Sequence, residues 1–143
     1  MLALSTKGRY AARIMVYLAA RRDLGPVSKY EIAAAEELSA DYIEQIMVRL
    51  RAAGLVISHR GRKGGFSIGQ DPTLITLGDV LSAVEGPIRP VPCIGSYCKR
   101  EATCPTRPIW DKAVALLEEL FGGTTIAEMA EESQTPQSLT YSI

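Results

Sequence analysis

The pattern of apolar residues changes abruptly at Gly54, and this change limits the fold to a few architectures. Before it, residues at the i, i+3, i+4 and i+7 spacing of an amphipathic helix are Ile43, Ile46, Met47 and Leu50. After it, the runs 55–57 and 66–68 have the composition of short β-strands. Glycines between the two runs allow the positive φ angles of a hairpin loop. The sequence therefore predicts a helix followed directly by a β-hairpin.

Further helices are expected on both sides of this unit. Ser28 and Ser39 are good N-cap residues for two short helices joined by a tight turn, which is the signature of a helix-turn-helix. With the hairpin, this predicts a winged helix-turn-helix. Two longer helices are expected over 5–22 and 109–121. Two shorter ones are expected to begin at Thr76, paired with Asp79 and ending at Gly86, and at Thr125, paired with Glu128.

The predicted fold class is mostly α with a small β-hairpin wing and a long C-terminal dimerisation helix. We divide the chain into a winged helix-turn-helix DNA-binding domain (1–86), a cysteine-bearing cluster loop (87–108), a dimerisation helix with a short terminal helix (109–132) and a tail expected to be disordered (133–143). A homodimer is expected because one appended helix has little else to cover its apolar face, and DNA half-sites favour two-fold symmetry.

The formal net charge of zero conceals opposite charges in the two halves of the chain. Residues 1–70 contain eleven Lys or Arg against six Asp or Glu, and residues 71–143 contain five against ten. The basic half carries the helix-turn-helix and the hairpin, so the asymmetry favours a basic working face. Neither a secretory signal nor an apolar stretch long enough for a membrane span is visible, so we expect a cytoplasmic protein without a membrane partner.

The second helix of the helix-turn-helix has side chains that do not face the core. They predict a surface that binds a double-stranded DNA operator. The hairpin tip adds cations without acidic partners at i, i+4, which suit phosphates or a narrow minor groove. Serines at the helix N-caps commonly hold phosphates. The candidate DNA-binding residues are Ser28, Ser39, Tyr42, Glu44, Gln45, Arg49, Arg60, Arg62 and Lys63.

All three cysteines, Cys93, Cys98 and Cys104, fall within twelve residues. They lie in a segment, 86–108, that also holds five prolines and is expected to be an irregular loop. In the cytosol, clustered thiols are more often metal ligands or redox groups than structural disulfides. The loop is therefore a candidate metal or redox site.

Several stretches also resemble a known family, the iron–sulfur cluster regulator (IscR) family, also called Rrf-two. The similar stretches are STKGRYAARIM (5–15), YIEQIMVRLRAAGL (42–55), the wing RGRKGGFSIG and the cysteine loop ending in CPTRPIW. The resemblance spans roughly residues 1–130 and implies winged-helix homodimers whose long C-terminal helices pair. It implies DNA contacts by Ser39, Tyr42, Glu44, Gln45 and Arg60. It also implies an iron–sulfur cluster, 2Fe-2S rather than 4Fe-4S, on Cys93, Cys98 and Cys104, sensing iron–sulfur, nitric oxide or redox status.

Two features depart from that family. Members with a two-iron cluster usually have a histidine three residues after the last cysteine, where this chain has Arg107, and the spacing from Cys93 to Cys98 is one residue shorter. The fourth ligand is thus unassigned; Glu101, a carboxylate of the partner chain, a water or a small molecule are the alternatives. His59, the only histidine, lies at the base of the wing and is interpreted as a polar or phosphate-contacting residue.

Other functions remain open at this point. A zinc site is disfavoured because structural zinc sites generally have four Cys or His ligands in short paired spacings. A family member without a cluster, acting through thiol redox or a partner protein, is the main alternative. An enzyme has little support, since no histidine stands with a nucleophile and no phosphate-binding loop is present in the sequence.

Overall fold

The hairpin and the helices predicted from the sequence are all present in the computed structural model, which describes residues 4–134. Within these residues the elements are α1 (Thr6–Ala20), η1 (Arg22–Leu24), α2 (Lys29–Glu36), α3 (Ala40–Ala52), β1 (Val56–His59), β2 (Gly65–Ile68), α4 (Leu77–Glu85), η2 (Glu101–Thr103), α5 (Arg107–Gly123) and α6 (Ile126–Gln134). The predicted winged helix-turn-helix is confirmed. Helix α6 ends two residues beyond the expected position 132, and the rest of the predicted tail lies outside the described residues.

Local capping explains where the helices begin. Ser28 and Thr76 form capping boxes, in which each hydroxyl accepts from the backbone N–H three residues on while an acidic side chain there accepts from the cap backbone. The Ser39 hydroxyl accepts from the backbone N–H of Tyr42, as expected for an N-cap. Thr125 makes the same reciprocal bonds with Glu128 at the start of α6. These four predicted helix starts are therefore confirmed.

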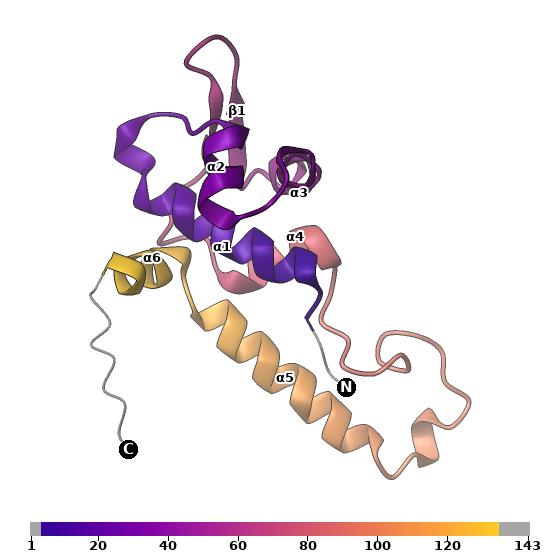
Figure 1. Cartoon of the computed structure of the whole chain (residues 1–143). Helices are drawn as coiled ribbons and strands as arrows, with labels where there is room; N and C mark the ends of the chain where they lie inside the picture. Colours follow the sequence, from indigo (N-terminus) through magenta and orange to yellow (C-terminus); the bar gives the residue numbers. More distant parts are fainter. Residues whose placement is uncertain (1–3, 135–143) are drawn as a thin grey trace, which may run out of the picture.

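Helix α1 runs through the centre of the molecule (Figure 1). One of its faces is almost fully buried, and the residues on that face are Ala11, Ile14, Met15 and Leu18. It contacts α2, α3, α4, α6 and β2. The apolar face predicted for α3 is fully buried in the same core. This single core positions the helix-turn-helix and the hairpin relative to each other.

The wing is joined to the helix-turn-helix by backbone pairing. Strands β1 and β2 pair antiparallel, with Val56 opposite Ile68 and His59 opposite Gly65. Val27, just before α2, exchanges two backbone hydrogen bonds of 2.8 Å with Phe66 of β2. This short third segment fixes the direction in which the hairpin leaves the body.

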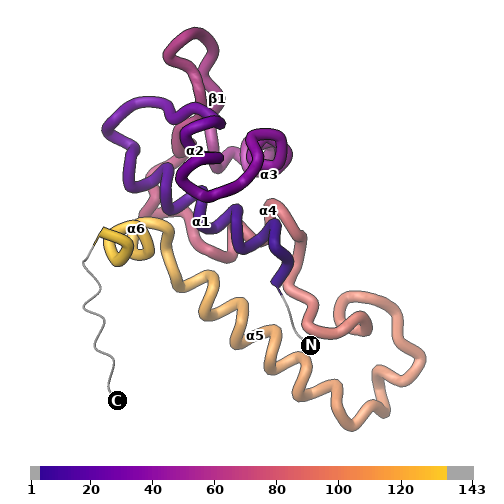
Figure 2. The backbone as a smooth tube through the Cα atoms, viewed as in Figure 1, coloured from indigo at the N-terminus to yellow at the C-terminus, as the bar shows by residue number. Residues whose placement is uncertain are grey.

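Helix α5 is the α-helix least embedded in the described fold. None of its residues is buried, and its exposed apolar side chains include Ile109, Leu116 and Leu120. Figure 2 shows it extending from the body to the long loop that follows α4. Among the described residues, no helix is both long and apolar enough to cross a membrane.

We predict that Gly65→Ala lowers the free energy of unfolding by about 2 kcal/mol. Gly65 has a φ of 149°, and a Cβ there would lie 2.3 Å from the Val27 carbonyl oxygen, so the wing attachment must shift. Gly123→Ala is the matched control, because a Cβ at Gly123 meets nothing within 4 Å. Urea denaturation of the two variants measures the difference; equal stabilities would contradict this role of Gly65.

Candidate nucleic-acid interface and cysteine loop

The outer face of α3 carries the side chains that the sequence assigned to DNA. Glu44, Gln45 and Arg49 are exposed, whereas Tyr42 is half-buried. The Tyr42 ring packs edge-on against Tyr10 of α1, with the ring centroids 6.1 Å apart. An aromatic ring held in this way keeps its hydroxyl in a defined place at the edge of the face.

A shallow hollow of about 390 Å³ lies on this face of α3, and α1 forms part of its lining. It is lined by Lys7 of α1 together with Tyr42, Gln45 and Arg49 of α3, among others. Sequence reasoning missed Lys7. The available signal was its position three residues before Tyr10, which places the two on one side of α1. Lys7 thus adds a cation to the predicted surface.

Ser28 and Ser39 both act as N-caps, each hydroxyl accepting a backbone N–H at 3.2 Å. A hydroxyl that accepts one hydrogen bond keeps its own proton to donate. Both serines can therefore cap a helix and donate to an outside acceptor such as a phosphate oxygen at the same time.

Glu44 of α3 forms an ion pair with a residue of α2. Its Oε2 accepts a hydrogen bond of 2.8 Å from Nζ of Lys29, the first residue of α2. This bond and the charge of Lys29 lower the pKa of the Glu44 carboxyl, and the same bond and the charge of Glu44 raise the pKa of Lys29. The pair ties the first turn of α2 to α3.

The tip of the wing is a group of exposed cations, Arg60, Arg62 and Lys63. Within residues 4–134 none of the three forms an ion pair. At the base of the wing, His59 Nε2 lies 2.7 Å from Ser67 Oγ on the other strand. His59 is therefore a polar residue that links the two strands of the hairpin. In the sequence it lies far from the three cysteines.

The cysteine loop joins α4 to α5, and its three thiols are free and half-buried. Among the described residues, no three His, Cys, Asp or Glu side chains are gathered in a way that could hold a metal ion. The sulfur of Cys104 lies within hydrogen-bond distance of the Thr106 hydroxyl, at 3.3 Å. Hydrogen bonding by Thr106 lowers the pKa of the Cys104 thiol, and the charge of Arg100 adds to this.

Arg107, which stands where the resemblance implies a histidine, is held by two carboxylates. It contacts Glu101 of η2 at 3.0 Å and Asp111 of α5 at 2.9 Å. A guanidinium is always protonated and has no lone pair to give to a metal. Glu101, one candidate for the fourth ligand, is thus occupied in an ion pair in this conformation.

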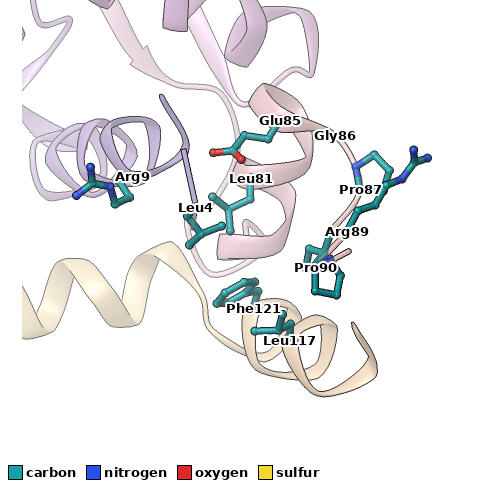
Figure 3. A pocket seen from close by; sticks show the side chains of 11 residues that line it. Leu4, Arg9, Leu81, Glu85, Gly86, Pro87, Arg89, Pro90, Leu117 and Phe121 are labelled. Atoms are coloured by element: carbon teal, nitrogen blue, oxygen red, sulfur yellow. The ribbon is translucent and has the colours of Figure 1, made fainter. Parts of the chain in front are cut away.

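A groove of about 790 Å³ lies between α1, α4 and α5. Leu4, Leu81, Leu117 and Phe121 face one another across it, and Glu85 lies at its rim (Figure 3). The beginning of the cysteine loop, 86–90, forms another wall. The groove therefore adjoins α1 and α4 of the winged-helix body, the cysteine loop and α5.

Comparisons with known proteins agree on one family. The sequence model of Rrf2, described as "Iron-dependent Transcriptional regulator", matches residues 4–132. The chain is 37% identical over 134 residues to the HTH-type transcriptional regulator CymR of Bacillus subtilis, covering 94% of both chains. It is 33% identical over 132 residues to the regulator IscR of Klebsiella pneumoniae, covering 92% of this chain and 81% of that protein.

Two solved structures have the same fold. The structure described as CymR, the global cysteine regulator of B. subtilis, has a TM-score of 0.80 at 39% identity, covering 92% of this chain and 98% of that one. The structure described as T. potens IscR has a TM-score of 0.77 at 36% identity, covering 98% and 96%.

Proposed function

Because the chain belongs to the Rrf2 family of transcriptional regulators, we propose that it binds a double-stranded DNA operator through α3 and the wing. The observation that carries this proposal is the group of exposed cations on the wing tip, at the same end of the body as α3 and opposite α5 (Figure 1). A recognition helix in the major groove and a basic wing beside it is a common docking geometry. Acting on DNA, such a regulator works in the cytoplasm and needs no catalytic activity.

Each part of the surface has a different task in this proposal. Gln45 reads an adenine edge and Glu44 accepts from a cytosine amino group. Ser28, Ser39, Tyr42 and Arg49 contact phosphates and set the position of α3, and the missed Lys7 joins them. On the wing, Arg60 enters a minor groove, where a narrow A·T-rich groove attracts cations, and Arg62 and Lys63 contact the flanking phosphates.

We further propose that two copies pair through α5. The helix has no buried residue and exposes Ile109, Leu116 and Leu120, a face that one chain leaves without cover. The apolar groove beside Leu117 and Phe121 gives a second copy a surface on which to pack. Pairing about a two-fold axis places two recognition helices for half-sites about 34 Å apart.

The cysteine loop is the proposed sensor, with an iron–sulfur cluster on Cys93, Cys98 and Cys104. Three thiolates are suitable donors for such a cluster, which supplies sensitivity to iron supply and oxidants when it is bound. The described arrangement does not fit a cluster as it stands, because no three candidate ligands of the described residues gather in one place and Arg107 offers no ligand. The support is thus the donor set and its place in the loop between the DNA-binding body and α5.

For the wing, we expect Arg62→Ala combined with Lys63→Ala to weaken DNA binding on every sequence alike. Each lost phosphate contact should also reduce the slope of log affinity against log salt by about 0.9. Fluorescence anisotropy of a labelled duplex over a salt series gives both values. Lys112→Ala, which removes an exposed cation from α5, is the matched control. An unchanged slope in the double variant would contradict the assignment of phosphate contacts to the wing.

For the dimer, we expect Leu116→Glu to produce a folded monomer, because the side chain is 56% exposed in the single chain and its charge opposes only the pairing. Sedimentation velocity gives the mass, and far-UV circular dichroism checks the fold. Glu119→Gln, on the same helix, should leave the dimer intact. A wild-type chain that stays monomeric in the presence of operator DNA would contradict the pairing.

For the sensor, protein purified without oxygen should be coloured and contain matched amounts of iron and acid-labile sulfide. Cys104→Ser should lose most of both, whereas Tyr97→Phe, an exposed non-ligand change in the same loop, should keep them. A colourless, iron-free wild type that still binds DNA would overturn the cluster and move the sensing role to bare thiols or a partner protein.

A further inference from the structure

Glu44 is an acidic residue on the face proposed to approach a polyanion. Its side chain is 57% exposed, so the carboxylate is accessible from that face. A lone carboxylate there is repelled by the phosphates that the neighbouring cations attract. The Lys29 ammonium, 2.8 Å away, cancels that charge at short range.

The contact is made between two helices that meet at the turn. Lys29 is the first residue of α2, and its side chain is 30% exposed, against the body of the helix-turn-helix rather than free in solvent. Its ammonium also lies 5.5 Å from the centroid of the Tyr30 ring. Ser28 caps the N-terminus of α2 and Ser39 caps that of α3. Lys29 and Glu44 therefore extend from helices whose first turns are held in place.

The ion pair uses one carboxylate oxygen. Lys29 donates to Oε2, and among residues 4–134 no other group donates a hydrogen bond to the Glu44 carboxylate. Oε1 is therefore open to an incoming donor. In the major groove the N4 amino group of cytosine is the donor that a carboxylate reads.

We propose that Lys29 is a positioning residue that holds Glu44 Oε2, so that Oε1 reads a cytosine amino group at one base pair of the operator. The base preference at that position then depends on both residues acting together. This inference rests on the proposed DNA-binding function. It assigns Lys29 a part in sequence selection, which no motif in the sequence indicated.

The competing explanation is that Lys29 is one more phosphate contact. A phosphate contact weakens binding to all sequences equally when it is lost, and it reduces the salt dependence. A positioning residue changes the relative affinity for different bases at one position, and its effect disappears when the residue it positions is removed. The two roles therefore give different results in a double-mutant cycle.

The experiment selects binding sites from a pool of randomised duplexes with the full-length protein. Wild type, Lys29→Met, Glu44→Ala and the double variant are compared, and affinities are then measured on the selected duplex and on its three single-base variants at each position. Lys29→Met keeps the aliphatic stem and removes the charge. Lys29→Arg is the conservative variant, and Lys63→Met on the wing is the matched loss of a lysine charge that does not touch Glu44.

We expect Glu44→Ala to lower the preference for cytosine at one position by about tenfold. Lys29→Met should lower it about threefold at the same position, as expected for loss of a partly exposed pair. Lys29→Arg should restore the preference, and Lys29→Met should have no further effect on it in the Glu44→Ala background. Lys63→Met should weaken all sequences without changing any base preference.

A Lys29→Met effect that is uniform over all bases, or that persists in the Glu44→Ala background, would overturn the positioning role and leave DNA binding intact. If wild type enriches no sequence from the pool and binds no duplex, the proposed function itself fails. The two failures are thus distinguishable in one experiment.

Discussion

The buried face of α1 is the contact on which the rest of the structure depends. Ala11, Ile14, Met15 and Leu18 are at most 2% exposed, and the helix touches α2, α3, α4, α6 and β2. Side chains packed to this degree allow little relative movement of the elements around them. The outer face of α3 is positioned by this core, and the backbone pairing of Val27 with Phe66 gives the wing its direction.

Most of the fold could be predicted because its signals are local. Helix starts at Ser28, Ser39 and Thr76 follow from capping, and the helical spacing in α3 follows from burial of one face. The unpredicted features all join residues far apart in the chain. Lys29 meets Glu44 across the helix-turn-helix, and Lys7 meets α3 through the packing of α1. No spacing rule connects such positions, so only the assembled core brings them together.

The cysteine loop illustrates the same limit in a functional site. Three nearby cysteines predict a donor set, but whether they converge depends on the loop's own contacts. Here Arg107, the first residue of α5, pairs with Glu101 of η2, and among the described residues no three candidate ligands gather in one place. The loop leads from α4 directly into α5, the helix proposed to pair two copies. A change of loop order therefore has a direct physical route to the spacing of two recognition helices.

The central claim is that α3 and the wing, and not α5, meet DNA. Hydrogen–deuterium exchange of the full chain, alone and with a duplex selected from a randomised pool, tests it most directly. Slower exchange in residues 39–52 and 56–68 upon DNA binding, with 107–123 unchanged, is the expected result. Slower exchange confined to α5 and α6, with α3 and the wing unaffected, would contradict it.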